Sequence, residues 1–181
     1  MAATSGTFNL VEITKVEYGD ADLVAGVVPS SLKTVGDIKE GQMNLDFPEA
    51  STTAEYSEQT QQPYRIRKAP VMRTATIELV TSLMTEVKDF LPGTFTAGAT
   101  GTTPDKLAIK SSGSIANKYV KVTGKNTVGQ VVTVELLNAF VTNSWSGAMG
   151  ANQETRGLMV KFNLLQDASA NKEEVIISAA F

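Results

Sequence analysis

The chain has 181 residues, a net charge of −3, no Cys and no His. The missing residue types exclude disulfides, thiolate nucleophiles, cysteine-ligated metals and histidine as a general base. The acidic balance, with a pI of about 5.1, argues against a specific reader of nucleic acid, which usually carries a basic patch. Carboxylate-only or Ser–Lys chemistry stays open on composition, but no constellation of base, nucleophile and oxyanion donors is visible in the sequence. We therefore expect that the protein is not an enzyme, that it has no cofactor and no metal site, and that residues 1–181 form a single domain.

The sequence contains no segment typical of export or of a membrane span. The first ten residues, MAATSGTFNL, lack the basic segment and the apolar core of a secretory signal. No apolar run approaches the roughly 20 residues that a membrane helix needs. We expect synthesis in the cytoplasm, no membrane partner, and a short N-terminal arm over residues 1–6 that has little to bury.

Alternation of apolar and polar residues predicts the first strands. Residues 7–18 alternate loosely, short β-type pieces follow at 23–28 and 32–38, and residues 41–47 alternate clearly. In the last segment, one face holds Met43, Leu45 and Phe47, and the other holds Gln42, Asn44 and Asp46. This pattern is typical of a strand with one core face and one polar face.

A polar segment with proline at both ends, residues 48–70, interrupts the strands. A connection of this length is uncommon in a compact domain unless it has a role, so we predict an extended functional loop. Its charges are divided along the chain. The acidic residues are Asp46, Glu49, Glu55 and Glu58, and the basic residues are Arg65, Arg67, Lys68 and Arg73.

After a predicted strand at 71–80, the spacing of apolar residues predicts one amphipathic helix over residues 82–91, which Pro92-Gly93 ends. The apolar stripe consists of Leu83, Val87, Phe90 and Leu91. A helix this short depends on tertiary packing, so we expect it to cover an open end or face of a sheet.

The rest of the chain predicts further β-structure. Residues 94–114, rich in Gly, Thr, Ala and Ser, indicate a loop with at most one short strand at 106–110. The remaining predicted strands are residues 118–123 and 130–142, which form a hairpin, and residues 156–165 and 175–180. The predicted fold is mainly β: a β-sandwich or barrel with one flanking α-helix and a long polar loop.

The run at 130–142 is the most informative strand, because strict alternation leaves both of its faces largely apolar. One face holds Val131, Thr133, Glu135, Leu137, Ala139 and Val141, and the other holds Val132, Val134, Leu136, Asn138, Phe140 and Thr142. One face would pack on the chain's own core. The other would need a helix, a second sheet or another subunit, which favours a protein built for assembly.

Several segments together resemble phage tail-tube (major tail) proteins, over most of the chain from about Gly41. They are GQMNLDFPEASTTAEYSEQTQQPY, VMRTATIELV, SLMTEVKDFLPG, and the pair VTVELLNAF and GLMVKFNLL around a Gly/Asn-rich loop. The resemblance implies a structural protein whose subunits form rings, usually hexameric, that stack into a hollow tube. Inner strands from all subunits would line the channel as one continuous barrel, and a long loop would reach neighbouring subunits.

The resemblance also implies a place and partners. The protein would be made in the host bacterium's cytoplasm and work in the virion tail, as the conduit for genome ejection. Its partners would be its own copies and other tail proteins, namely the tape measure, the terminator, and the baseplate or tip. DNA would pass without specific binding along a mildly acidic wall. The predicted lumen-facing residues are Gln42, Asn44, Asp46, Thr74, Thr76, Glu78, Lys161 and Asn163.

The predicted contacts between subunits lie mainly in the 48–70 loop. We hypothesise that its acidic half meets a basic half on an adjacent subunit and fixes the ring register. The alternative is a solvated hairpin whose charges face each other within one chain. The residues are Glu49, Glu55, Glu58, Arg65, Arg67 and Lys68, with Trp145 as an anchoring aromatic or, alternatively, a core residue that closes the hairpin.

Two other functions stay open on the sequence. The same pattern suits the inner tube of a contractile injection or secretion machine, which shares the tail-tube fold. A monomeric β-sandwich that binds carbohydrate would need a strip of exposed aromatics, for which the candidates are Trp145, Tyr56 and Tyr64. The glycine-rich stretch 146–152 lacks the Lys-Ser/Thr ending of a phosphate loop.

Overall fold

The computed structural model describes residues 12–22, 28–35, 38–49, 52–69, 72–79, 84–99, 102–110, 114–144, 158–165 and 173–179. These ranges are dominated by strands, so the predicted mainly-β class is confirmed. The strands are β1 (Glu12–Asp20), β2 (Lys33–Thr34), β3 (Ile38–Asp46), β4 (Thr52–Tyr56), β5 (Pro63–Lys68), β6 (Thr74–Leu79), β7 (Gly93–Thr96), β8 (Lys106–Ile109), β9 (Lys118–Lys125), β10 (Val131–Ser144), β11 (Leu158–Leu164) and β12 (Val175–Ala179).

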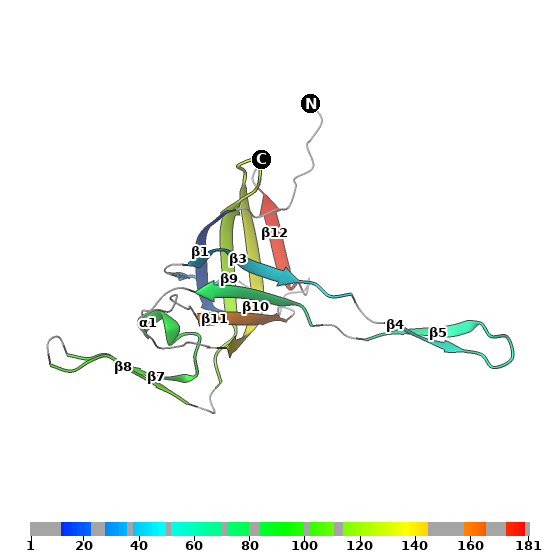
Figure 1. The fold of residues 1–181 in the computed structure, drawn as a ribbon, viewed down its shortest axis with the longest axis horizontal. Coiled ribbons are helices and arrows are strands. Elements are labelled where there is room, and N and C mark those ends of the chain that lie inside the picture. The colour runs from blue at the N-terminus through cyan, green and yellow to red at the C-terminus, as the bar shows by residue number, and fades with distance from the viewer. Residues whose placement is uncertain are drawn as a thin grey trace, which may run out of the picture.

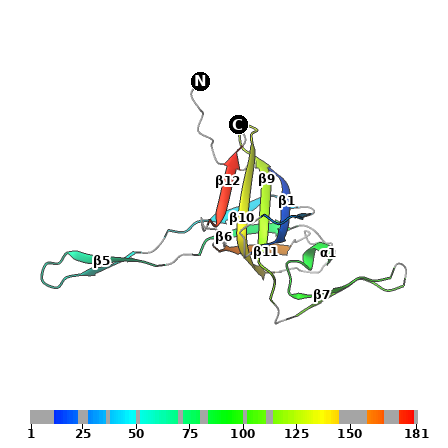
Figure 2. The same ribbon diagram turned by 180° about the vertical axis from the view of Figure 1, so that it is seen from behind.

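Eight strands form one antiparallel sheet that folds over itself. Its order is β2-β1-β9-β10-β11-β6-β3, and β12 also pairs with β10. The antiparallel strands β1, β9, β10 and β12 lie along one axis, and β3, β6 and β11 cross them (Figures 1 and 2). The molecule is therefore a sandwich of two crossing layers with side chains from both layers in one core, an arrangement known for sheets that pack at near right angles.

Strand β10 belongs to both layers. Its first half pairs with β9 on one side and β12 on the other, and its second half, from Ala139 onward, pairs with β11. A β-bulge lies between Leu136 and Ala139, where β10 advances one residue more than β9. A bulge bends its strand and raises the local twist, which is what allows one strand to pass from one layer to the other.

The bulge corrects the prediction that β10 has two apolar faces. Before it the buried residues are Val132, Val134 and Leu136, and after it they are Ala139 and Val141. The extra residue shifts the phase of alternation, so Ala139 and Val141 lie on the core side with Val132, Val134 and Leu136. Strict alternation was wrong here because it assumes an unbroken period of two. The outer face of β10 is therefore less apolar than predicted, although Val131 and Phe140 on it are each 44% exposed.

The flanking helix predicted over residues 82–91 is wrong. The described part of this segment holds a single helical turn, α1 (Met84–Val87), followed by a turn in which the Phe90 N–H donates to the Val87 carbonyl at 3.0 Å. The apolar residues Phe90 and Leu91 are nevertheless buried, so the stripe identified core residues but not their conformation. In the described ranges, no helix has the length and apolarity to cross a membrane.

Aromatic rings join the turn after α1 to both layers. The Phe90 ring centroid lies 4.7 Å from that of Tyr18 on β1 and 6.3 Å from that of Phe162 on β11, the second pair edge to face. Phe90 and Phe162 are almost completely buried. Two hairpins, β4–β5 before this turn in the sequence and β7–β8 after it, project from the body (Figure 1).

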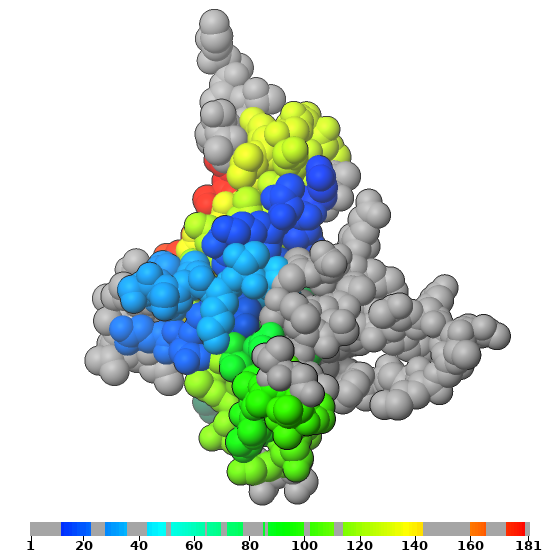
Figure 3. Space-filling model, turned by 90° about the vertical axis from the view of Figure 1, so that its left-hand side faces the viewer, coloured from blue at the N-terminus to red at the C-terminus, as the bar shows by residue number. Residues whose placement is uncertain are grey.

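Both predicted loops contain strands. Within 48–70, β4 pairs with β5, and after α1, β7 pairs with β8, so the 94–114 segment holds a hairpin rather than a loop with one strand. The two hairpins project from opposite sides of the body (Figure 1), and Figure 3 looks at the side that carries the β7–β8 hairpin. Most of their side chains are exposed on both faces of the hairpin. The sequence therefore lacks the alternation of buried apolar and exposed polar residues on which strand prediction depends.

The predicted hairpin of residues 118–123 and 130–142 is confirmed as β9 and β10. A buried side chain holds its turn: the Asn126 amide oxygen accepts hydrogen bonds from the backbone N–H groups of Val128 and Gln130 at 3.1 and 2.9 Å. Gly129 has a φ of 80°, a left-handed conformation that glycine adopts without steric cost. Asn126 and Gly129 thus fix where β9 ends and β10 begins.

Candidate assembly surface

The predicted lumen residues come from separate strands, and the structure places those it describes on one face. Strands β3, β6, β11 and the second half of β10 lie side by side, and we name them the polar strip. Directly paired residues of an antiparallel sheet point to the same face. Two rows cross the strip: Asn44–Thr76–Lys161–Thr142 and Asp46–Thr74–Asn163–Phe140.

The two faces of the polar strip differ sharply in burial. The row residues are exposed or partly exposed. The residues that alternate with them on β6, β10 and β11 are buried, whereas those on β3, Met43 and Leu45, are partly buried; the buried ones are Ala75, Ile77, Val160, Phe162 and Val141. Side-chain hydrogen bonds join neighbouring strands on the open face: Asn163 Nδ2 donates to Thr142 Oγ1 at 3.2 Å, and that hydroxyl donates to the Lys161 carbonyl at 3.3 Å. The strip is thus a sheet with one core face and one wet face.

The wet face carries few charges. Among its described side chains Asp46 is acidic and Lys161 is basic, and the others in the two rows are amides, hydroxyls and one phenyl ring. Phe140 is 44% exposed, an apolar residue that the sequence analysis did not place on this face. Gln42 and Glu78 belong to the same strands, but their side chains lie outside the described part of the chain.

In the described ranges neither outer edge of the polar strip has a ladder partner, although β3 also contacts β1. Strand β3 forms a ladder with β6 alone, and residues 140–144 of β10 form one with β11 alone, because the β9 ladder stops at Ala139. An open edge presents unpaired N–H and C=O groups to any strand that can reach them. Since the four strands alternate in direction, β3 and the second half of β10 run antiparallel to each other.

The predicted intersubunit residues lie on the β4–β5 hairpin or at its base, with one exception. Glu49, Glu58, Arg65, Arg67 and Lys68 are exposed there, and Glu55 is partly exposed. The Arg67 Nε atom lies 2.8 Å from Glu55 Oε1, so at this pair an acidic and a basic residue meet within one chain. Trp145, the exception, falls outside the described residues.

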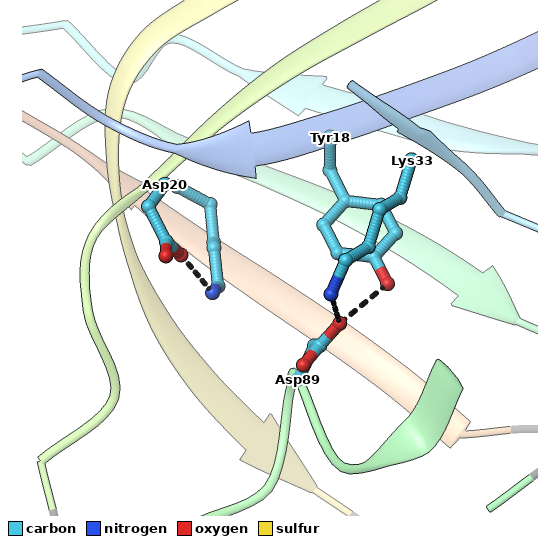
Figure 4. A network of polar contacts seen from close by, with 5 residues as sticks. Tyr18, Asp20, Lys33 and Asp89 are labelled. Carbon is cyan, nitrogen blue, oxygen red and sulfur yellow. Dashed lines mark hydrogen bonds and ion pairs between the residues drawn. The ribbon is translucent and has the colours of Figure 1, made fainter. Parts of the chain in front are cut away.

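A polar cluster that the sequence analysis missed surrounds Asp89 (Figure 4). Tyr18 Oη donates to Asp89 Oδ2 at 2.9 Å, and Lys33 Nζ donates to the same oxygen at 2.6 Å. Close by, the buried Lys118 ammonium pairs with Asp20. These residues line a cleft of about 360 Å³. No sequence signal could reveal the cluster, because its members come from β1, β2, β9 and the turn after α1.

The charged groups of this cluster stabilise one another. Its described carboxylates and ammoniums pair with one another, and the described residues hold no group of three or more Asp or Glu side chains placed to bind a metal. Burial alone would raise the pKa of Asp89. The hydrogen bonds from Lys33 and Tyr18, with the nearby charges of Lys33 and Lys118, outweigh burial and lower that pKa below its ordinary value of 3.8.

The lowered pKa of Asp89 predicts a pH-dependent contribution to stability. A carboxylate with a depressed folded-state pKa stabilises the fold above its unfolded pKa, and this contribution disappears as the pH falls through the folded value. Asp89→Asn is therefore expected to be less stable than the native protein at pH 7, by a gap that shrinks below about pH 4. Urea unfolding at pH 7, 4 and 2.5 measures the gap. Lys33→Met should reduce its pH dependence; a gap unchanged with pH would contradict the assignment.

Neither a protein-family model nor any curated protein matches this chain. We therefore infer a function from the surfaces of the polar strip and of the two hairpins.

Proposed function

We propose that this protein is the subunit of a tube, of the kind that forms phage tail tubes. Copies join edge to edge through their polar strips, and the wet face of each strip lines the channel. One observation carries the proposal: four neighbouring strands have buried or partly buried side chains on one face and mainly polar ones on the other, and in the described ranges the two outer strands have no ladder on their outer side. Pairing between copies removes both open edges, which are otherwise sites of uncontrolled aggregation.

The number of strands in the strip supports closure into a ring. A rotated copy presents its β10 edge to the β3 edge of its neighbour. Because each strip has four alternating strands, the two edges meet antiparallel, and the alternation continues around the ring. A hexameric ring, the state that the resemblance implies, would have about 24 strands, more than the 16–18 strands of porin barrels that already enclose an aqueous channel.

The wet face suits a wall along which DNA moves without being held. Phosphates bind where Lys and Arg displace their counterions, and each described strip offers one Lys balanced by one Asp. The tube would then conduct the genome in the virion tail, in contact with the proteins that set its length and close its ends. No catalysis is part of this role.

Engineered cysteines test the proposed seam, because the native chain has no Cys. Asn44→Cys and Thr142→Cys lie on the two outer strands of one row, separated by β6 and β11. Three strand spacings amount to about 14 Å, beyond the reach of a disulfide within one chain. We expect oxidation of the double variant to give a ladder of covalent oligomers that ends at a closed ring, with rings visible by negative-stain electron microscopy.

Single variants are the matched controls, since each can give at most a dimer. The register between copies is not fixed by one chain, so Asn44→Cys is also combined with Phe140→Cys, one row along. The proposal is wrong if neither pair gives a ladder and the native protein sediments as a monomer at high concentration.

A further inference from the structure

The layer that crosses the polar strip extends beyond it at one end. We name β1, β9, β12 and the first half of β10 the outer layer. Strands β9 and β10 continue past Val122 and Val134, their last core members before the turn, to Lys125 and Val131. Three residues at about 3.4 Å each give about 10 Å of overhang before the turn itself. Figures 1 and 2 show this end, which we name the tip (residues 125–131), beyond β3.

The tip is a well-bonded turn with an exposed apolar side chain. Asn126, which is 4% exposed, donates from Nδ2 to Gln130 Oε1 at 2.9 Å, and its backbone N–H donates to the Gln130 carbonyl at 3.0 Å. Val128, at the end of the turn, is 70% exposed. A turn that is already held in one conformation loses little freedom on binding, so it suits a contact with another molecule.

The opposite end of the outer layer carries the cleft around Asp89. Strand β1 ends there at Asp20, and β9 begins there at Lys118. Pro29 lines the cleft, and Val28 beside it is 47% exposed. Asp20 pairs with Lys118 through Oδ1, and the Asp20 side chain is 71% exposed. The mouth of the cleft therefore offers an apolar spot and an accessible carboxylate.

The proposed ring would bring these two ends together. The β10 edge of the polar strip begins at the cleft end, since Ala139 pairs with Lys118, and the β3 edge lies toward the tip (Figure 1). When the β3 edge of one copy joins the β10 edge of the next, the tip of the first points at the cleft of the second.

The length of the overhang suits a ring of six copies. Stacked sheets lie about 10 Å apart, so the circumference at the outer layer exceeds that at the channel wall by about 63 Å, or about 10 Å for each of six copies. Without an overhang the outer layers of neighbouring copies would be separated by this gap. The tip has about the length that fills it.

We propose that the tip of one copy docks at the cleft of the next copy in the same ring. Val128 packs on Val28 and Pro29 at the mouth of the cleft. Lys125 pairs with Asp20. This inference rests on the proposed tube. It adds a contact outside the channel seam, completes the cleft with a second copy, and sets how many copies close the ring.

Apolar burial provides most of the attraction in this contact. Glu12 pairs with Lys125 in the β1–β9 ladder and offsets its charge, whereas the cleft is lined by three Asp and two Lys. Exposed ion pairs contribute little and are screened by salt. Removal of the two exposed valines from water is favourable and does not depend on charge. We therefore expect the contact to persist at high salt.

Engineered cysteines test the contact, because the native chain has no Cys. Val28→Cys and Val128→Cys lie at opposite ends of the outer layer, separated by the 8 residues of β9, a span of about 27 Å that no disulfide bridges within one chain. We expect oxidation of the double variant to give a ladder of covalent oligomers that ends at a closed ring of six copies, counted by mass.

Two controls accompany this variant. Each single variant can give at most a dimer. Val28→Cys combined with Ile177→Cys, at an apolar residue of β12 that is 44% exposed, is the matched double variant outside the tip and should give no ladder.

Val128→Asp measures the contact without a cross-link. The melting temperature of the subunit should stay within a few degrees, because the side chain is exposed, while the protein concentration at which rings form should rise by about tenfold or more. A ladder from the seam cysteines with none from Val28→Cys and Val128→Cys, or unchanged ring formation by Val128→Asp, would overturn this inference and leave the proposed tube intact. Native protein that stays monomeric and gives no seam ladder would instead overturn the proposed function.

Discussion

Val141→Asp is expected to unfold the protein, whereas Thr142→Asp one residue away is expected to fold. The β10 bulge turns Val141 into the core, where it is 5% exposed, and leaves Thr142 on the wet face of the polar strip. A carboxylate at position 141 would be buried without a partner, at a cost of several kcal/mol, comparable with the whole stability of a domain. Circular dichroism and urea unfolding of the two purified variants measure the difference.

This pair of substitutions also tests the bulge. Without a bulge, strict alternation would put Thr142 on the same face as the buried Val132 and Val134, and Val141 on the opposite face. The expected outcomes would then be exchanged. A folded Val141→Asp protein together with an unfolded Thr142→Asp protein would show that β10 keeps a single phase.

Phe162→Ala is expected to lower the free energy of unfolding by about 3–5 kcal/mol, the usual cost of truncating a buried phenylalanine. Phe162 is 2% exposed and packs edge to face against Phe90, which in turn contacts Tyr18 in the other layer. The cavity would therefore open where the two layers and the turn after α1 meet. Chemical denaturation with fluorescence or circular dichroism gives the value.

The neighbouring strand offers a matched control. Phe140→Ala removes the same side chain from the wet face, where 44% of the residue is exposed, and should cost far less. Equal losses for the two variants would contradict the assignment of one buried face and one wet face to the polar strip.

Sequence patterns predicted the alternation of most of β3 and β6, although Phe47, expected on the core face of residues 41–47, is 46% exposed. Residues 41–47 and 71–80 alternate regularly, and the structure pairs them as β3 and β6 with Asn44, Asp46, Thr74 and Thr76 on the open side. The β9–β10 hairpin was also predicted correctly, because two strong β runs flank a short polar turn. In these elements the residue type follows burial, so the alternation in the sequence predicts the strand and its two faces.

The features that sequence patterns missed depend on contacts far along the chain. The β10 bulge lies where one strand passes between two crossing layers, a feature that local alternation does not show. The Asp89 cluster forms only when β1, β2 and β9 lie together. The predicted helix failed for a related reason: Phe90 is buried between Tyr18 and Phe162 from a turn that bends out of the helix. The tail-tube function and the seam between copies stay predictions.

Because β10 runs through both layers as one continuous backbone, the layers are joined by covalent bonds as well as by side-chain packing. A sideways pull on the polar strip would be transmitted along the peptide chain into the strands that flank the first half of β10. Peeling one layer from the other would require the hydrogen-bonded ladders beside that strand to shear together. The two layers therefore separate only if β10 loses its ladders on one side of the bulge.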